Sequence, residues 1–203
     1  MYEASTMRLS VLTLDCCSGQ AWGILGFAQS YAWTKDPAIL QTATALSDHF
    51  LKRLSSATHR YPYVPLWDFD DNDPSLLRDT SAGMIAANGL LILHQQLATE
   101  KSPYLEAVGH IVKDTVNLSL ATDLAPFVVD EASGKIDVAE SSWASILKNA
   151  TANNNESAIF RYSDHGLVYA DYYFLELGNK LLRMGLVWCN STFWHGRVKS
   201  CDI

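Results

Sequence analysis

Ser18-Gly19-Gln20-Ala21-Trp22-Gly23 opens the first helical stretch of the chain, and the turns after it (residues 24–28) are small or apolar. The stretch places the Gln20 amide and the Trp22 indole at a helix entrance. A hydrogen-bonding side chain beside a flat aromatic face suits a polar ring such as a sugar. The alternative is that Trp22 belongs to the core and Gln20 only occupies the first turn.

The composition indicates one globular domain. The 203 residues are 48% hydrophobic and 18% charged, and a chain of this length can bury a sizeable core. No run approaches the ~20 apolar residues of a membrane-spanning helix. The net charge of −7 and the lack of a basic cluster argue against nucleic acid as a partner, because phosphate neutralisation needs clustered Lys and Arg. We expect neither a membrane nor a nucleic acid as partner.

The four cysteines lie at the two ends of the chain. Cys16 and Cys17 precede the first helical stretch, and Cys189 and Cys201 follow the last one. The adjacent pair lacks the C-x-x-C spacing and the paired histidines of a metal or redox site. The sequence therefore predicts no metal site and leaves open whether a disulfide joins the ends.

Four N-x-Ser/Thr sequons would matter only in a secretory pathway. The apolar run of residues 9–14 is too short for a signal peptide, so we expect an intracellular protein. The sequons begin at Asn117, Asn149, Asn155 and Asn190.

Apolar residues spaced three and four apart predict an all-α fold. The expected helices cover residues 20–33, 37–54, 82–97, 103–120, 142–149 and 169–183. Asp36, followed by Pro37, is expected to cap the second helix. Asp79 takes the same role before the third helix, whose small residues allow a close approach by its neighbours.

Two connections have the character of functional loops. Residues 55–78 contain Pro62 and Pro65, which exclude a helix, and residues 161–166 lead into the last helix. A short hairpin is expected around Ser133-Gly134, whereas residues 188–203 show no period. The sequence thus predicts antiparallel helix pairs with the long loops gathered between them.

The acidic residues of the first loop allow two interpretations. Asp68, Asp70, Asn72 and Asp79 fall at positions 1, 3, 5 and 12 of an EF-hand loop, but Asp73 stands where the turn needs glycine. A solvated or wall-forming loop is therefore favoured over a calcium site. Alternatively, a carboxylate pair from Asp68, Asp70 and Asp79 performs acid–base chemistry, with burial raising one pKa. The alternative to acid–base chemistry is that Asp79 only caps a helix and that Asp68 and Asp70 hydrogen-bond the backbone of their own loop.

The third cluster surrounds His165, which can donate or accept a proton near neutral pH. Tyr169 and Tyr173 share one face of the following helix. A single histidine is more often structural than catalytic. No Gly-x-Ser-x-Gly elbow occurs, so a nucleophilic triad has no support.

Four segments of the chain are informative because of the order in which they occur. The segments are Gly19-Gln20-Ala21-Trp22-Gly23, Pro65-Leu66-Trp67-Asp68-Phe69-Asp70, Arg78-Asp79-Thr80-Ser81-Ala82 and Gly166-Leu167-Val168-Tyr169-Ala170-Asp171-Tyr172-Tyr173-Phe174-Leu175-Glu176. Together they resemble the C-terminal half of glycoside hydrolase family 88, the unsaturated glucuronyl hydrolases. The resemblance covers residues 18–187 and leaves residues 1–17 as a divergent leader and residues 188–203 as a divergent tail.

The resemblance implies a partial (α/α)6 barrel of the six-hairpin glycosidase type, about half of the ring. It implies hydrolysis at an unsaturated uronic acid on the non-reducing end of lyase-generated oligosaccharides. An aspartic acid protonates the C4=C5 double bond, water adds at C5, and the hemiketal rearranges and releases the sugar, without metal or cofactor. The substrate-binding residues implied by the resemblance are Gln20, Trp22, Trp67, His165 and Tyr169.

The chain departs from the family in two ways. The family's catalytic aspartates lie upstream of the Gly-Gln-Ala-Trp segment, so no catalytic residue is assigned in this chain. Ser18 replaces the usual arginine, a natural partner for a carboxylate. We expect a truncated and catalytically impaired form that is weakly stable as a monomer and self-associates through its exposed half-barrel surface. The alternatives are residual hydrolysis by Asp68 or Asp70, a non-catalytic carbohydrate-binding module, and a helical scaffold.

Overall fold

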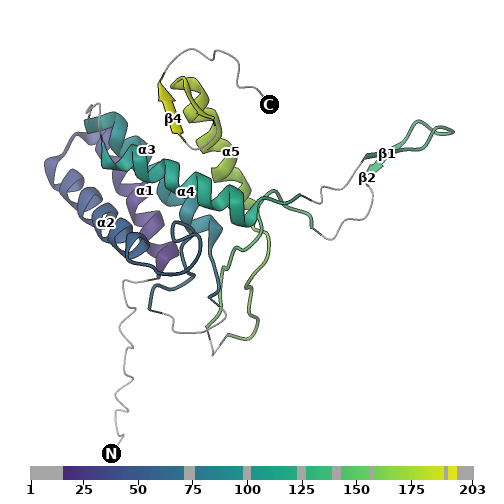
Figure 1. The fold of residues 1–203 in the computed structure, drawn as a ribbon, viewed down its shortest axis with the longest axis horizontal. Coiled ribbons are helices and arrows are strands. Elements are labelled where there is room, and N and C mark those ends of the chain that lie inside the picture. The colour runs from purple at the N-terminus through teal and green to yellow at the C-terminus, as the bar shows by residue number, and fades with distance from the viewer. Residues whose placement is uncertain are drawn as a thin grey trace, which may run out of the picture.

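The computed structural model describes residues 16–70, 76–97, 102–122, 127–138, 143–155, 158–189 and 192–195. These residues are mostly helical (Figure 1), which confirms the predicted all-α class. The helices are α1 (Cys17–Thr34), α2 (Pro37–Ser55), α3 (Thr80–Leu97), α4 (Pro103–Ser119) and α5 (Val168–Arg183). Two small antiparallel hairpins pair β1 (Phe127–Val129) with β2 (Ile136–Val138), and β3 (Leu186–Cys189) with β4 (Thr192–His195).

Helices α1, α3 and α5 form an inner row with α3 in the middle. Both α1 and α5 pack on α3, while α2 packs on α1 and α4 packs on α3. The N-terminal ends of the inner helices meet around Asp79. Their C-terminal ends meet where Lys35 bonds Gln96 and where Gln95 bonds the Met184 sulfur. The three inner helices therefore run parallel to one another.

The predicted close approach to α3 is confirmed where α1 crosses it. A Cβ atom at Gly89 would lie 2.8 Å from the Leu25 nitrogen and 2.9 Å from the Leu25 Cα. Helix α3 is buried on all sides over most of its length. It is therefore the centre of the core, and only a residue without a side chain fits at position 89.

The predicted helix starts are confirmed by their caps. The Asp36 carboxylate accepts a hydrogen bond from the Ala38 N–H at 2.8 Å, with Pro37 in the first turn. The Asp79 carboxylate accepts one from the Ser81 N–H at 3.0 Å. Each cap satisfies an amide that the helix itself leaves unpaired.

The predicted hairpin is confirmed as β1 and β2, which face each other with Val128 opposite Asp137. Gly134 lies between them with φ +66°, in the left-handed region where glycine has no Cβ penalty. The hairpin projects away from the helices (Figure 1).

The helix expected at residues 142–149 is wrong for the part that the structure describes, residues 143–149. Other elements take up its backbone groups. The Asp171 carboxylate accepts the N–H groups of Ile146 and Leu147, each at 2.9 Å, and Lys148 donates to the Ser119 carbonyl at 2.8 Å. Because these amides are bound elsewhere, the segment forms an extended connection.

The described part of the stretch expected to show no period, residues 188–189 and 192–195, forms strands instead. Strands β3 and β4 pair there with Leu186 opposite His195, after a turn at Gly185 with φ +69°. No helix in the described ranges is both long and apolar enough to cross a membrane.

Candidate functional site

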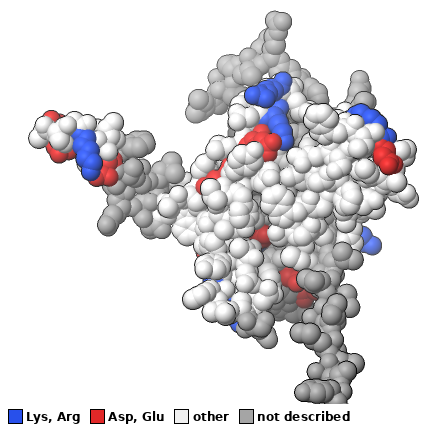
Figure 2. Space-filling model, turned by 180° about the vertical axis from the view of Figure 1, so that it is seen from behind, with Lys and Arg blue, Asp and Glu red and all other residues white. Residues whose placement is uncertain are grey.

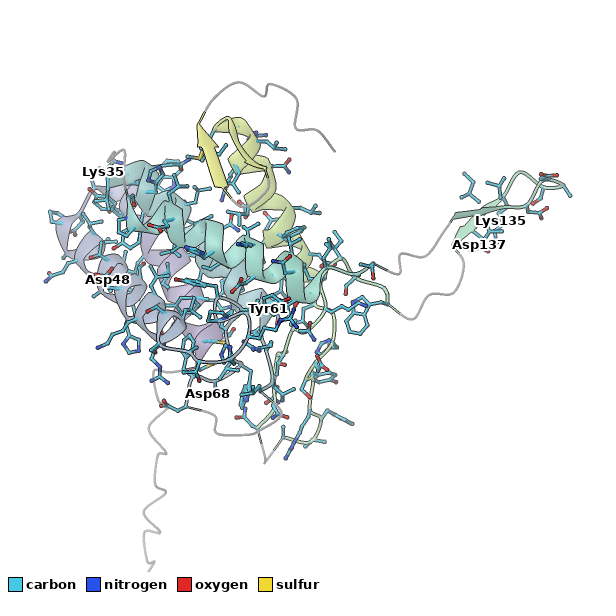
Figure 3. The ribbon with its side chains drawn as sticks, viewed as in Figure 1. Lys35, Asp48, Tyr61, Asp68, Lys135 and Asp137 are labelled. Atoms are coloured by element: carbon cyan, nitrogen blue, oxygen red, sulfur yellow. The ribbon has the colours of Figure 1, made fainter. Side chains whose placement is uncertain are left out.

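The N-terminal ends of the three inner helices form the candidate site. Both loops predicted to be functional reach this end. Cys16 forms a bridge with Asp68 of the first loop. The second loop reaches it through residues 149–150, since Ala150 forms a bridge with His165 and the Thr80 N–H donates to the Asn149 carbonyl at 3.1 Å. Figure 3 shows Asp68 near the start of α1 and Lys35 at the opposite end of the helices.

Asp79 is the central buried group of this site. Its Oδ1 accepts the Ser81 N–H at 3.0 Å and the Ser81 hydroxyl at 2.5 Å. Only 1% of the residue is exposed. Burial raises the pKa of the Asp79 carboxyl, while hydrogen bonds from Ser81, Ala82 and Thr151 oppose the rise. Asp79 caps α3 as predicted, and it also ties α3 to the connection at Thr151.

Tyr169 joins this cluster from the first turn of α5. Its hydroxyl is hydrogen-bonded to the Ser81 hydroxyl, which in turn donates to Asp79. Burial and the nearby Asp79 charge raise the pKa of Tyr169 above its ordinary value. The phenol therefore stays neutral, and because the Ser81 proton goes to Asp79, the Tyr169 O–H is the donor to the Ser81 oxygen.

Cys17 is the buried thiol of the same cluster. It donates to the Trp67 carbonyl at 3.1 Å and lies 3.9 Å from the Asp79 carboxylate. Burial, then the Asp79 charge, raises its pKa well above the ordinary value. A thiol held protonated in this way is a poor nucleophile. Trp67 therefore lies beside the start of α1. Its backbone N–H donates to the Leu77 carbonyl at 2.9 Å.

An aromatic cluster lies beside these polar groups and joins α1 to α5 across α3. The Trp22 and Tyr173 rings meet edge to face, with centroids 5.5 Å apart, and Tyr173 meets Tyr172 in the same way at 5.0 Å. Trp22 is 44% exposed, whereas Gln20 is buried in the first turns of α1. The tyrosines were visible in the sequence as neighbours on α5, but their contact with Trp22 requires the tertiary packing.

His165 lines a separate cavity of about 330 Å³, bounded also by Trp143, Ser145, Gly166 and Asp171. Its Nδ1 lies 2.8 Å from the Gly166 carbonyl and so carries the proton. Its buried Nε2 has no hydrogen-bond partner among the described residues. None of the other four predicted binding residues lines this cavity.

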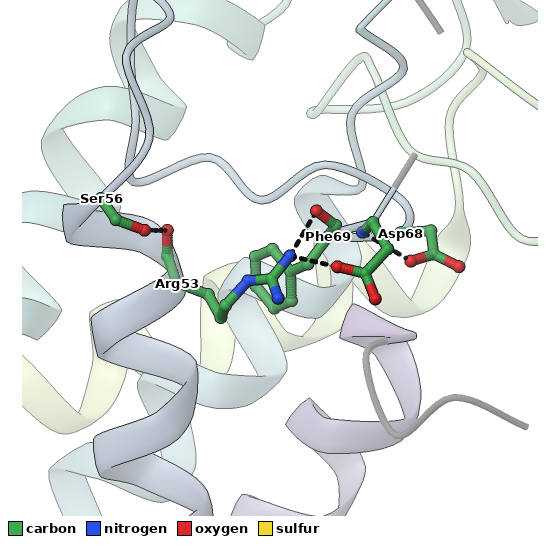
Figure 4. Close-up of polar contacts among 5 residues, drawn as sticks. Arg53, Ser56, Asp68 and Phe69 are labelled. Atoms are coloured by element: carbon green, nitrogen blue, oxygen red, sulfur yellow. Dashed lines mark hydrogen bonds and ion pairs between the residues drawn. The ribbon is translucent and has the colours of Figure 1, made fainter. Parts of the chain in front are cut away.

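Asp68 and Asp70 organise their own loop (Figure 4). The Arg53 guanidinium bonds Asp70 at 2.7 Å and lies over the Phe69 ring, 5.4 Å from its centroid. Asp68 accepts the Asp70 N–H at 2.9 Å. Among the described residues, no three His, Cys, Asp or Glu side chains are grouped to hold a metal. Asn72 and Asp73 of the EF-hand alternative lie outside the described residues.

The parallel inner row, its outer helices and the polar and aromatic end define part of an (α/α)6 barrel of the six-hairpin glycosidase type. A crystal structure of the unsaturated glucuronyl hydrolase from Bacillus sp. GL1, responsible for the degradation of glycosaminoglycan, matches with a TM-score of 0.61 at 27% identity. The match covers 82% of this chain and 39% of that chain. No protein-family model matches the chain.

Two curated relatives match most of this chain. The unsaturated glucuronyl hydrolase of Formosa agariphila is 30% identical over 169 residues, which are 78% of this chain and 34% of the relative. The unsaturated chondroitin disaccharide hydrolase of Streptococcus pyogenes is 30% identical over 183 residues, covering 87% and 38%. The chain belongs to the unsaturated glucuronyl hydrolases, glycoside hydrolase family 88, and spans about a third of the length of these relatives.

Proposed function

We propose that this chain binds an unsaturated uronic acid at the non-reducing end of a lyase-generated oligosaccharide, at the N-terminal ends of α1, α3 and α5. The Trp22–Tyr173 pair carries the proposal, because it presents aromatic rings from two inner helices at one end of the row. Sugar rings stack on such faces through their C–H groups. The relatives named above, unsaturated glucuronyl hydrolases among them, support this substrate class.

The helix ends suit the carboxylate of a uronic acid. Helices α1 and α5 have no side-chain cap and direct their positive dipole ends toward this region, which favours an anion, whereas Asp79 binds the first amides of α3. The Tyr169 hydroxyl, which donates to Ser81, is proposed to accept a hydrogen bond from a sugar hydroxyl. His165 is proposed to contact the sugar that follows the uronic acid through the cavity that it lines.

We propose that the chain binds this substrate without supplying its own proton donor. Family hydrolysis needs a carboxylic acid that reaches the C4=C5 bond. Asp79 is the carboxyl with a raised pKa at this end, but it is buried and bonded to Ser81. Asp70 accepts a hydrogen bond from the Arg53 guanidinium at 2.7 Å and is half exposed on its own loop. The chain then acts as a carbohydrate-binding unit with impaired catalysis.

Calorimetric titration with an unsaturated uronyl disaccharide tests the binding proposal. We expect measurable heat, and Trp22→Ala should weaken binding by about 1–2 kcal/mol, the order of an aromatic contact. Phe27→Ala is the matched control, because Phe27 is 39% exposed on the same helix and contributes to no feature of the site. The absence of heat at millimolar disaccharide would rule the binding proposal out.

Loss of the absorbance of the double bond tests turnover in the same samples. We expect no turnover above the rate measured in buffer alone. If turnover is seen and Asp70→Asn abolishes it, the alternative in which Asp70 is the acid is established. This substitution keeps the shape of the side chain and removes its acidic proton.

The remaining sequence-based expectations stay proposals. We propose that the chain has no nucleic-acid or membrane partner and that it self-associates. The domain bounds and the intracellular location likewise rest on the sequence.

A further inference from the structure

Arg78 directly precedes the central carboxylate of the candidate site, Asp79, and its side chain is half-buried. Charged side chains are sparse in this protein, since they make up 18% of the residues and Figure 2 shows wide uncharged areas on the described part of the rear face. Burial lowers the pKa of the Arg78 guanidinium, and the Asp114 charge opposes this only in part. A cation withdrawn from water needs hydrogen-bond acceptors within the protein, and those of Arg78 lie in the loop between α2 and α3.

The Arg78 guanidinium donates to three backbone carbonyls of one turn in this loop. Its Nη1 donates to the Val64 carbonyl at 2.7 Å and to the Tyr61 carbonyl at 3.3 Å. Its Nη2 donates to the Arg60 carbonyl at 2.9 Å. Tyr61 has φ +59°, a left-handed conformation that is unfavourable for a residue with a Cβ atom. The hydrogen bonds from Arg78 offset this strain and hold the turn of residues 60–64 around one side chain.

The backbone around Arg78 holds the next residues of the same loop. Leu66 forms a bridge with Arg78, and the Asp79 N–H donates to the Pro65 carbonyl at 3.0 Å. Trp67 follows directly and lies beside the start of α1. The side chain and the backbone of Arg78 therefore together hold the stretch that leads to Trp67.

We propose that Arg78 is a positioning residue of the candidate site, whose guanidinium holds the turn of residues 60–64 in the shape that places Trp67 beside α1. This role rests on the proposed function, because Trp67 is one of the residues expected to bind the sugar. The geometry requires arginine. A guanidinium presents a fixed fork of N–H groups, whereas lysine carries its charge at one nitrogen and cannot span these carbonyls in the same way. We therefore expect Arg78→Lys to keep the charge and to release the turn.

His59 contacts the same guanidinium and has to be neutral to do so. Its Nε2 lies 3.3 Å from Nη1 of Arg78, and its Nδ1 lies 3.4 Å from the Arg60 carbonyl. Because arginine only donates, Nε2 accepts and Nδ1 carries the proton. Burial, then the Arg78 charge, lowers the pKa of His59, and the Asp114 charge on α4 opposes this. Arg53 of α2 lines the same cavity as His59. Protonation in acid would turn an N–H and a second positive charge toward Arg78 and so weaken its hold on the turn.

Amide hydrogen exchange of the intact chain, followed by NMR, tests the hold on the turn without any sugar. In Arg78→Lys, exchange at the Tyr63 and Val64 amides should become at least about tenfold faster, because both amides are bonded only while the turn is in place. The amides at the centre of α3 should keep their wild-type rates. Arg60→Lys is the matched control, since its guanidinium is exposed in the same turn and lies over a neighbouring ring. Unchanged exchange at the two amides, equal acceleration in α3, or an equal effect of Arg60→Lys would overturn the proposal.

The pH dependence of the same two amides tests the part of His59, which a merely structural arginine would not affect. The native pKa of His59 lies below its ordinary value of 6.5. The held turn is therefore fully stable above this pH and loses stability as the pH falls below it. After correction for the intrinsic rates, wild-type exchange at Tyr63 and Val64 should accelerate below about pH 6.5. His59→Gln, whose amide accepts a hydrogen bond and does not titrate, should abolish this acceleration. The same pH dependence in both proteins would refute the part of His59.

Calorimetric titration with an unsaturated uronyl disaccharide connects the turn to the site. Arg78→Lys should raise the Kd by about fivefold or more, because a loop that has to be ordered on binding lowers affinity. Arg60→Lys should leave the Kd unchanged. Wild-type affinity in Arg78→Lys would overturn the positioning role. If the wild-type chain gives no heat, the proposed function is refuted and the positioning role with it, whereas the hydrogen-exchange result for the turn stands by itself.

Discussion

Replacement of Gly89 by alanine perturbs the tightest contact between α1 and α3. The new Cβ would lie 2.8 Å from both the Leu25 nitrogen and the Ile24 Cγ2 atom. The Leu25 nitrogen and Cα belong to the backbone, so no side-chain rotation relieves the overlap. Helix α1 must instead move by about 0.6 Å, from 2.8 Å to the 3.4 Å at which ordinary contact begins.

Two opposing terms set the size of the effect. Alanine favours a helix over glycine by about 1 kcal/mol, whereas overpacking a close-packed core costs about 1–3 kcal/mol. Since the obstacle is backbone, we expect the upper part of that range and a net loss of about 1–2 kcal/mol. For a chain of this size the Tm then falls by about 2–8 °C.

Thermal unfolding followed by circular dichroism, at one fixed protein concentration, measures this change. Gly178→Ala is the matched control, because Gly178 lies inside α5 and its Cβ would meet nothing within 4 Å. The control should be unchanged or more stable by up to about 1 kcal/mol. If Gly89→Ala unfolds at the wild-type temperature or above it, the inferred close packing of α1 on α3 is incorrect.

Three further substitutions test the roles of individual carboxylates. Burial holds the pKa of Asp79 above its unfolded value near 3.8, so the native state binds more protons than the unfolded state. The stability of the wild-type protein should therefore fall relative to that of Asp79→Asn as the pH rises above this value. Denaturant midpoints across pH that diverge in the opposite direction would contradict this. Asp36→Ala should cost about 1 kcal/mol in urea unfolding through the lost cap, and Asp36→Asn much less. Asp171→Ala leaves the Ile146 and Leu147 amides without their acceptor. Hydrogen exchange at these two amides should therefore become at least about tenfold faster. Unchanged protection would show that the Asp171 carboxylate does not hold this segment.

The helices were predictable where local chemistry repeats. The cap at Asp36 and the apolar spacing of α2 are local, and both were found as expected. The hairpin at Gly134 follows from turn chemistry in the same way. The helix expected at residues 142–149 failed because Asp171, more than twenty positions away, binds the amides that a helix would have used. A long-range acceptor of this kind leaves no local signal.

The candidate site likewise combines residues that the sequence identified with contacts that only the tertiary structure revealed. Motif order identified Trp22, Trp67 and Tyr169 as residues of interest, whereas the sequence left Asp79 open between a helix cap and one member of a carboxylate pair. Folding showed that Asp79 also connects to Tyr169 through Ser81 and lies beside Cys17. It also placed His165 on a cavity with Trp143 and Asp171, which the sequence did not indicate.

The sequence by itself determined the helical class, the caps and the family, because periodicity, capping chemistry and ordered motifs are written in neighbouring residues. The tertiary structure decided which helices form the inner row and which carboxyl is buried. These depend on contacts between residues far apart in the chain, such as Trp22 with Tyr173 and Gly89 with Leu25. Burial, and the pKa shifts that follow from it, exist only once those contacts form.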